Sequence, residues 1–277
     1  MDADRWLITG ASTGLGRSLA EEALARGGSV AGTVRTEAAA EAFAALAPGR
    51  AHPVLLDVTD AAGVADAVPR AADLLGGLDV VVNNAGYGVA GAFEECTDEQ
   101  VRQQFEVNVF GALAVTRAAL PILRNQGSGV IVQISSQAGR FAGPGLSVYA
   151  ASKWALEGLS EGLARELAGT GVRVLIVEPG PFRTDWAGRS MEFATPMEEY
   201  AATVDPMRLR LVALNGRQPG DPARAARIVC DVLGREDPPL RLPLGRLAVE
   251  TVTRAAREAL AGADEWGDVA RQADFPD

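Results

Sequence analysis

The sequence predicts an α/β fold: a single domain built on a doubly wound parallel sheet of about seven strands, with helices on both faces. Short apolar runs alternate with longer, alanine-rich amphipathic segments along most of the 277 residues. The runs are apolar at nearly every position rather than at every second one, which is typical of strands covered on both faces. Regular alternation of strand and helix implies parallel strands joined by right-handed crossovers.

The elements follow one another without a linker, a repeat or a low-complexity block, so we expect one domain over residues 1–277. The predicted strands are WLIT (6–9), SVAGTV (29–34), PVLL (53–56), DVVV (79–82), GVIVQI (129–134), VRVLIV (172–177) and PLRL (239–242). The predicted helices cover roughly 15–26, 37–46, 61–75, 98–125, 149–168, 222–234 and 246–261.

The stretch 181–221 interrupts this alternation. It is rich in Pro, Met, Arg and Glu, has no clear strand pattern and is too long for an ordinary connection. In doubly wound folds, ligands bind beyond the carboxyl ends of the strands. We therefore expect residues of about 185–220 to form a substrate lid, and residues of about 245–277 to form a C-terminal extension.

Composition excludes several functions. The formal net charge of −10 and the pI near 4.8 argue against a nucleic-acid-binding surface. His52 is the only histidine, so histidine triads and multi-histidine metal sites are excluded, and we interpret His52 as structural. Cys96 and Cys230 are far apart and indicate free thiols and no metal site. With no signal-peptide pattern and no membrane-spanning apolar run, a cytoplasmic protein is expected.

A glycine-rich turn, TGASTGLG (Thr9 to Gly16), follows the first strand. Glycine permits a positive φ in a tight turn and lets the backbone approach a pyrophosphate, while the following helix offers its N-terminal N–H groups to the phosphates. Three glycines also occur in ordinary turns. The position between the first strand and the first helix favours a dinucleotide site.

The spacing TGxxxGxG resembles the nucleotide loop of the short-chain dehydrogenase/reductase superfamily, in its compact single-domain branch. Further motifs match in the family's order over about residues 5–190: Asp57 in LLDVT, NNAG (83–86), Asn108 in FEVNVFG, Ser136 in ISSQAG, YAASK (149–153) and EPGPFRT (178–184). The resemblance implies a Rossmann fold and a nicotinamide cofactor. The cofactor contacts that it implies are Gly10, Ser12, Thr13, Gly14, Leu15, Gly16, Arg35, Asp57, Val58, Asn84, Ala85, Gly86, Tyr149, Lys153, Pro179, Gly180, Phe182 and Thr184.

Tyr149 and Lys153 lie at i and i+4, on one face of a predicted helix. Lys153 is the only lysine, since 26 Lys+Arg residues include 25 arginines. Codon bias explains the scarcity of lysine but not the position of this one. A nearby ammonium should lower the pKa of the tyrosine and suit it to proton transfer. The resemblance assigns Lys153 a second task, holding the nicotinamide ribose, for which a planar guanidinium is a poor substitute.

Ser136 lies 13 positions before Tyr149, the family's usual interval, and is expected to hydrogen-bond the substrate oxygen. Ser135 is the alternative. The resemblance gives Asn108 the role of holding a water that links the lysine to solvent; the alternative is a buried amide with ordinary local hydrogen bonds. Asn108, Ser136, Tyr149 and Lys153 are thus the predicted catalytic residues.

The end of the second strand reads SVAGTVRT, with Val34 where NAD-selective folds carry an acidic residue. Arg35 follows and suits a 2′-phosphate, so NADP(H) is expected rather than NAD(H). Ser12 could add a hydroxyl donor. The alternative is that Arg35 is a solvated helix-start residue beside Glu37.

These residues predict hydride transfer between the nicotinamide and a carbonyl or alcohol. Apolar side chains near the expected site favour a bulky apolar ketone or aldehyde, and the layout resembles hydroxysteroid- and retinol-dehydrogenase-like members. The side chains are Phe141, Pro144, Phe182, Trp186, Met191, Phe193, Met197, Tyr200 and Met207. A non-catalytic dinucleotide sensor is the alternative; an epimerase or dehydratase would carry another loop spacing and a longer C-terminal domain. The family implies a homodimer or homotetramer through the helices at 98–125 and 149–168.

Overall fold

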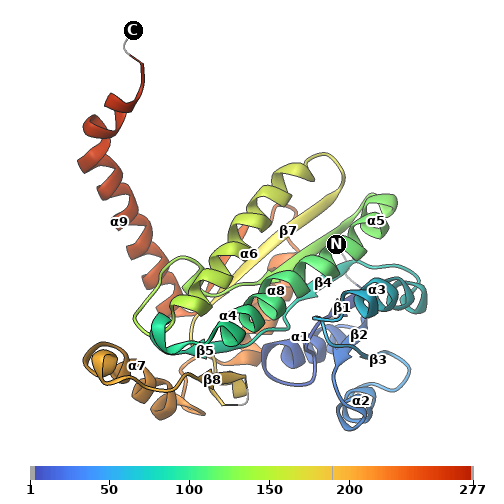
Figure 1. Cartoon of the computed structure of the whole chain (residues 1–277). Coiled ribbons are helices and arrows are strands. Elements are labelled where there is room, and N and C mark those ends of the chain that lie inside the picture. The colour runs from blue at the N-terminus through green and yellow to red at the C-terminus, as the bar shows by residue number, and fades with distance from the viewer. Residues whose placement is uncertain (1–3, 189, 276–277) are drawn as a thin grey trace.

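The computed structural model describes residues 4–188 and 190–275. Its main sheet is parallel throughout, in the order β3-β2-β1-β4-β6-β7-β9 (Figure 1). The strands are β1 (Arg5–Ile8), β2 (Ser29–Val34), β3 (Ala51–Leu55), β4 (Val80–Asn83), β6 (Gly129–Ile134), β7 (Val172–Pro179) and β9 (Arg241–Leu244). The strand order reverses between β1 and β4, which makes the sheet doubly wound. The predicted fold class is confirmed.

Two hydrophobic cores lie on the two faces of this sheet, because neighbouring residues of each strand point to opposite sides. Trp6 and Ile8 belong to the core under α1 (Gly14–Ala25), α2 (Glu37–Ala44) and α8 (Pro222–Leu233). Leu7, between them, belongs to the core under α3 (Ala61–Leu75), α5 (Ala112–Gln126) and α6 (Ser147–Glu166). This two-sided burial is the physical reason why the strand sequences are apolar almost throughout.

The helix predicted at 98–125 consists of three parts: α4 (Asp98–Phe105), the π-helical turn η2 (Glu106–Gly111) and α5. The whole run Asp98–Gln126 is long and apolar enough to cross a membrane by length and composition alone. Core helices pass the same test, and Val115, Ala119 and Leu123 of this run are buried in the second core. We interpret it as a core helix of the α/β domain.

The segment 181–221 contains more regular structure than the sequence predicts. It carries the short turns η4 (Asp185–Ala187) and η5 (Glu198–Tyr200), the helix α7 (Ala201–Leu214) and a strand, β8 (Met191–Phe193). The strand pairs in parallel with β5 (Gly88–Ala90) in a separate small sheet. The expectation that this segment lacks a strand was wrong, because three residues are too few to show a periodic pattern.

The last helix, α9 (Arg246–Ala270), is longer than the predicted 246–261 and leaves the body of the protein (Figure 1). The last strand, β9, also begins two residues later than the predicted 239–242. Cys96 and Cys230 are free thiols, as predicted.

Candidate active site

The glycine-rich turn between β1 and α1 needs its three glycines for two different reasons. Gly10 and Gly14 have φ of +65° and +60°, in the left-handed region that other residues rarely adopt. Gly16 has no such backbone, but a Cβ there would lie 2.3 Å from Asn84 Nδ2 and 2.6 Å from the Gly10 carbonyl oxygen. The turn is therefore shaped by the absence of side chains, as a phosphate cradle requires.

Asn84, directly after β4, fastens this turn to the neighbouring strand end. Its Nδ2 donates to the carbonyl oxygens of Thr9 (2.9 Å) and Gly10 (3.1 Å). The backbone N–H groups of Asn84 and Ala85 both donate to Thr9 Oγ1. The side chain of Asn84, predicted as a cofactor contact, thus holds the cradle in place.

Ser12, Thr13 and Leu15 line the open side of the same turn as half-buried or exposed residues. Thr13 occupies the N-cap position of α1 but makes no side-chain capping bond. The Thr13 side chain therefore does not occupy the N–H groups at the start of α1.

Lys153 and Tyr149 are both buried on the first turns of α6. Lys153 Nζ lies 5.9 Å from the centroid of the Tyr149 ring and donates to the Ile134 carbonyl oxygen at 2.9 Å. Burial lowers the pKa of the Lys153 ammonium to about 8, while the Glu157 carboxylate acts in the opposite direction. The ammonium approaches Gly86, where a Cβ would lie 3.7 Å from Nζ.

The pKa of Tyr149 moves in the direction opposite to the sequence-based expectation. Burial raises it to about 12, and a hydrogen bond with Ser136 opposes that rise. The expectation of a lowered pKa was wrong for the protein without cofactor, because the cost of desolvating the phenolate outweighs the stabilising groups around it. The Tyr149 ring also packs against Trp186, with centroids 5.0 Å apart.

The two serines at the end of β6 have different environments. Ser136 Oγ accepts from the Ala138 N–H at 3.0 Å, and its side chain is hydrogen-bonded with Tyr149. Ser135 Oγ is buried without a partner among the described residues and lies on the side of Glu157 and Gly139. Of the two, Ser136 is the serine that shares a hydrogen bond with the tyrosine.

Asn108 lies in the π-helical turn η2, and its side chain is engaged by the protein. Oδ1 accepts from the Tyr87 N–H at 3.0 Å, and Nδ2 donates to the Tyr87 carbonyl oxygen and to Ser152 Oγ at 2.9 and 3.1 Å. Both amide hydrogens are therefore used inside the protein. These are the ordinary local hydrogen bonds of a buried amide, which were the alternative for Asn108, and they hold the chain beside Gly86.

The residues described so far fit a nicotinamide dinucleotide. A cradle without Cβ atoms lies at one end, where a helix begins, and a buried lysine, tyrosine and serine lie at the other. Such a cofactor, when bound, supplies or accepts the hydride.

Comparison with known proteins decides the family. The model of the family described as short chain dehydrogenase matches residues 5–194. The chain belongs to the short-chain dehydrogenase family. Its members are dinucleotide-dependent oxidoreductases that act on CH–OH groups, and the predicted resemblance is confirmed.

Three curated relatives of this short-chain dehydrogenase have informative names. Oxidoreductase BOA17 of Botryotinia fuckeliana is 43% identical over 265 residues, 95% of this chain and 97% of the relative. A 3-ketodihydrosphingosine reductase of Bacteroides thetaiotaomicron is 34% identical over 87% of each chain. An NADPH-dependent 3-dehydrocapnine reductase of Ornithobacterium rhinotracheale is 37% identical over 70% of each.

Solved structures agree in fold. A short-chain dehydrogenase from Streptomyces avermitilis is 46% identical, with a TM-score of 0.93 over 99% of this chain and 100% of that one. A Burkholderia cenocepacia short-chain dehydrogenase in complex with NADP is 35% identical, with a TM-score of 0.71 over 87% and 96%. A Burkholderia phymatum member in complex with NAD is 24% identical (TM-score 0.81; 100% and 97% covered) and shows the fold alone.

This short-chain dehydrogenase has a cavity of about 310 Å³ at the carboxyl ends of β2 and β3. Its lining includes Arg35, Asp57 and a second arginine, Arg70, from α3. Asp57 Oδ1 accepts from the N–H and the hydroxyl of Thr59, which shapes the turn before α3. Val58 is buried beside Gly111. Sequence reasoning missed Arg70, because nothing in its spacing links it to Arg35.

Pro179 closes β7, and the Gly180 N–H donates to the Leu244 carbonyl oxygen at 3.0 Å. Thr184 lies next to the cradle, since a Cβ at Gly14 would be 3.4 Å from Thr184 Cβ. The Phe182 ring packs over Gly220, with which its backbone forms a bridge. The side chain of Phe182, predicted as a cofactor contact, is thus used in packing this turn.

On the side of Ser135 lies a buried group of charges that the sequence did not predict. Glu157, one turn after Lys153, accepts from Arg241 Nε at 3.0 Å, and Glu178 accepts from Arg140 Nη1 at 3.2 Å. Burial and the neighbouring Glu157 carboxylate raise the pKa of Glu178. The pair Lys153–Glu157 is visible in the sequence as an i, i+4 spacing, whereas Arg241 is 84 residues from Glu157.

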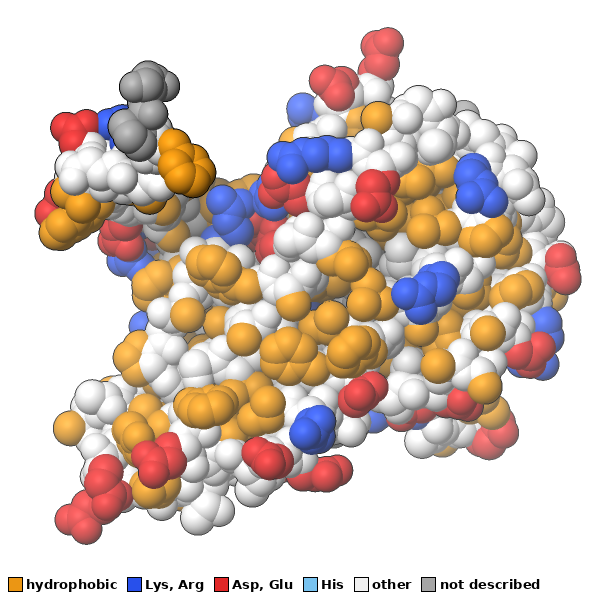
Figure 2. All heavy atoms as spheres, turned by 45° about the horizontal axis from the view of Figure 1, so that its top comes forward, with side chains coloured by type: hydrophobic (Ala, Val, Ile, Leu, Met, Phe, Trp, Pro, Cys, Tyr) orange, Lys and Arg blue, Asp and Glu red, His pale blue; other side chains and the backbone are white. Residues whose placement is uncertain are grey.

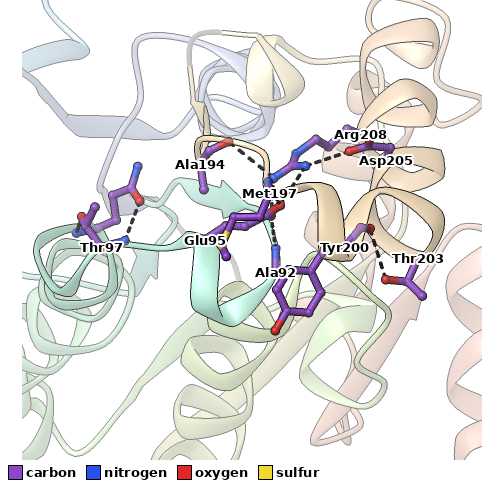
Figure 3. Close-up of polar contacts among 10 residues, drawn as sticks. Ala92, Glu95, Thr97, Ala194, Met197, Tyr200, Thr203, Asp205 and Arg208 are labelled. Atoms are coloured by element: carbon purple, nitrogen blue, oxygen red, sulfur yellow. Dashed lines mark hydrogen bonds and ion pairs between the residues drawn. The ribbon is translucent and has the colours of Figure 1, made fainter.

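The segment expected to be a lid is tied to the body by a buried ion pair between Glu95 and Arg208 of α7 (Figure 3). Glu95 also accepts from the N–H groups of Ala92 (2.6 Å) and Met197 (2.8 Å). Burial acts to raise the pKa of Glu95, but the bonds from Met197, Arg208 and Ala92 outweigh it and hold the pKa below its ordinary value. Glu95 is therefore a fully bonded carboxylate that holds both Met197, before α7, and Arg208, within α7, against the body.

Proposed function

We propose that this short-chain dehydrogenase transfers hydride between NADP(H) and a bulky apolar ketone or aldehyde, or the corresponding alcohol. The observation that carries the proposal is the buried group of Ser136, Tyr149 and Lys153 beside the carboxyl end of β6. A serine hydroxyl and a tyrosine hydroxyl that bond to each other can bond to the same substrate oxygen.

In the direction of reduction, Ser136 and Tyr149 hold the carbonyl oxygen, and Tyr149 donates its proton as the alcohol forms. A phenol with a pKa of about 12 keeps its proton at neutral pH and is ready to donate it. The Lys153 ammonium, held by the Ile134 carbonyl, stabilises the phenolate that remains. Asn108 acts as a positioning residue through Tyr87 and Ser152.

Arg35 supports NADP(H) as the cofactor. It lies at the cavity beside β2, which ends on Val34 rather than on an acidic residue that could accept from a ribose 2′-hydroxyl, and a guanidinium suits a 2′-phosphate. One relative is named for NADPH dependence, and one similar structure contains NADP.

Apolar groups beside Tyr149 support a bulky apolar substrate. Trp186 packs on the Tyr149 ring, and Gly88 leaves room for both Trp186 and Met191, since a Cβ there would lie 2.9 and 3.1 Å from their atoms. A Cβ at Gly143 would lie 3.5 Å from the Phe141 ring and 3.9 Å from the Met207 methyl group. Two relatives are named for reducing 3-keto or 3-dehydro compounds.

Residues 185–220 act in this proposal as a lid that orders over cofactor and substrate within the single domain. The protein acts in the cytoplasm as a homodimer or homotetramer. Exposed Phe110 of η2, with Trp154 and Leu159 of α6, supports association through these helices, and Figure 2 shows hydrophobic side chains gathered across the middle of one face.

The deciding experiment measures kcat/KM with NADPH and with NADH for a series of ketones and aldehydes of increasing apolar size. We expect NADPH to be preferred and kcat/KM to rise with apolar size. A protein that binds NADPH but oxidises it with none of these compounds would favour the non-catalytic sensor. A preference for small polar aldehydes would contradict the apolar pocket.

A further inference from the structure

Glu157 is a buried carboxylate that the proposed reaction does not use. It is 4% exposed and lies one helical turn after Lys153, which is 5% exposed, on the same face of α6. Burying a charged group costs free energy unless opposite charges or hydrogen bonds compensate for the lost water. The position of Glu157 beside the predicted active site therefore needs a physical reason.

Arg241 accounts for only one of the two oxygens of Glu157. Arg241 Nε, from β9, donates to Glu157 Oε2 at 3.0 Å. Oε1 is buried and has no hydrogen-bond partner among the described residues. It lies beside Gly139, where a Cβ would be 3.3 Å from Oε1 and 2.7 Å from Ser135 Oγ. The carboxylate thus presents an uncompensated oxygen at the end of β6.

The Lys153 ammonium reaches the same end of β6. Its Nζ donates to the carbonyl oxygen of Ile134, the residue directly before Ser135, at 2.9 Å. Within residues 4–188 and 190–275, the close salt bridge of Glu157 goes to Arg241 and not to Lys153, so the carboxylate acts on the ammonium through space. Burial lowers the pKa of Lys153, and the Glu157 carboxylate is the group that opposes this effect.

Other charges pack around Glu157 without taking over this task. Glu178 is a second buried carboxylate, but it accepts from Arg140 Nη1 at 3.2 Å, and burial together with the Glu157 carboxylate raises its pKa. Arg241 Nη2 also donates to Glu161 Oε2 at 2.7 Å. The charged and titratable groups that face the pair are Tyr149 and Glu161 on α6, Glu178 on β7, Arg241 on β9 and Arg140 in the loop after β6. Of the carboxylates among them, Glu157 is the one that acts on Lys153.

We propose that Glu157 is a positioning residue of the reaction: its carboxylate keeps the buried Lys153 ammonium charged, and Arg241 holds that carboxylate in place. The inference rests on the proposed function, in which the ammonium stabilises the phenolate that remains after Tyr149 has donated its proton. A neutral amine would stabilise this phenolate poorly. The other task open to Glu157 is to anchor β9 through Arg241, a task that Glu161 shares.

The charge of Lys153 can be measured directly, because Lys153 is the only lysine of the chain. Protein labelled with ¹³C at the lysine ε-carbon gives one lysine NMR signal, whose chemical shift follows the protonation of Nζ. We expect a titration midpoint of about 8 in the wild type. Glu157→Gln should lower the midpoint by about one pH unit, because a nearby opposite charge changes a pKa by about that much. The matched control is Glu161→Gln, which removes a carboxylate from the same arginine one turn further along α6 and should leave the midpoint unchanged.

A double variant separates the charge of Glu157 from the stability of its ion pair. Glu157→Gln with Arg241→Gln removes both members of the pair together, so no guanidinium loses its buried partner. Its midpoint should also fall below that of the wild type, because the carboxylate and not Arg241 acts on Lys153. Circular dichroism and urea unfolding check that each variant is folded.

The pH dependence of ketone reduction connects this charge with turnover. At saturating NADPH, kcat/KM for the ketone should decline at high pH as Lys153 loses its proton. The decline should begin about one pH unit lower in Glu157→Gln than in the wild type or in Glu161→Gln. A residue that only anchors β9 would lower the activity equally at every pH.

Three results would overturn the proposal. They are a midpoint that neither Glu157→Gln nor the double variant lowers, an equal fall in Glu161→Gln, and a pH profile that stays in place although the midpoint moves. The NMR titration needs no substrate. A protein that reduces none of the ketones would therefore contradict the proposed function, while the midpoints would still decide whether Glu157 keeps Lys153 charged.

Discussion

The Lys153 ammonium lies 5.9 Å from the centroid of the Tyr149 ring, and its Nζ atom donates to the Ile134 carbonyl oxygen. Both side chains are buried, and burial shifts the pKa of each toward its neutral form, to about 8 for Lys153 and about 12 for Tyr149. The pair is thus prepared to hold a proton on the phenol rather than to release it. A charged cofactor and a substrate oxygen must complete the site.

Substitution of either Tyr149 or Lys153 should remove nearly the same share of activity, because the two residues act together. Tyr149→Phe should lower kcat by about 10²–10⁴-fold, the usual contribution of a positioned proton donor, while NADPH still binds. Lys153→Arg should lose nearly as much, because a guanidinium does not fit where Nζ meets Ile134 and Gly86. The double variant should be little worse than either one. Steady-state kinetics and NADPH titration give these values, and an active Lys153→Arg variant would contradict the need for an ammonium.

The depressed pKa of Lys153 predicts a pH dependence of stability. Its pKa is about 8 in the folded protein and ordinarily 10.5, so between these values the unfolded chain binds more protons. The contribution of Lys153 to the free energy of unfolding therefore rises with pH from 8 toward 10.5, by up to about 1.4 kcal/mol per pH unit, and is constant below 8.

The measurement compares urea unfolding of the wild type and of Lys153→Met between pH 7 and pH 10. The stability of the wild type relative to the variant should increase above pH 8. The comparison stays below pH 10, because the raised pKa of Tyr149 makes the contribution of Tyr149 to the free energy of unfolding fall as pH rises from 10 toward 12. A stability difference that is flat with pH would mean that Lys153 keeps its ordinary pKa.

Gly16 and Gly162 offer a matched pair of glycine-to-alanine changes. A Cβ at Gly16 would strike Asn84 Nδ2 and the Gly10 backbone, whereas nothing lies within 4 Å of one at Gly162 in α6. Gly16→Ala should weaken NADPH binding at least about tenfold because the cradle must shift. Gly162→Ala should leave binding unchanged and stabilise the protein by about 0.5–1 kcal/mol. Calorimetric titration and urea unfolding test both; equal binding by the two variants would contradict the cradle.

Glu95 and Glu94 are neighbours with very different environments. Glu95→Gln removes the buried carboxylate that Arg208 bonds and leaves it only the part-exposed Asp205, at a cost of up to about 3 kcal/mol, whereas Glu94 makes only an exposed bond to the Tyr200 hydroxyl. Limited proteolysis of the wild type should cut within 185–220 and slow when cofactor and substrate bind. Glu95→Gln should speed the cutting, and Glu94→Gln should not. Cutting that ligands leave unchanged would count against a lid.

Arg35 should determine cofactor choice. Hydrogen bonds to a charged group are worth about 1.5–3 kcal/mol, so Arg35→Ala should reduce the preference for NADPH by about tenfold or more. Arg70→Ala tests whether the second arginine of the cavity shares this task. The ratio of kcat/KM for NADPH and NADH, with one ketone substrate, is the measurement. An unchanged ratio in Arg35→Ala would remove Arg35 from the site.

The sequence by itself determined the sheet, the cradle and the spacing of Tyr149 and Lys153, because each depends on neighbours in the chain. Buried strands must be apolar on both faces, a tight turn must carry glycine, and residues four apart share a helix face. The same local logic placed Ser136 and Arg35 at strand ends.

Only the tertiary structure decided the rest. Glu95 and Arg208 are 113 residues apart, and the three-residue strand β8 exists only because β5 lies beside it. The direction of the Tyr149 pKa follows from how much water the folded chain excludes, which no spacing reveals. The exposure of the apolar face of α9 is also decided by the tertiary structure. The apolar pattern is visible in the sequence, but whether the body covers that face depends on where the helix leaves the fold.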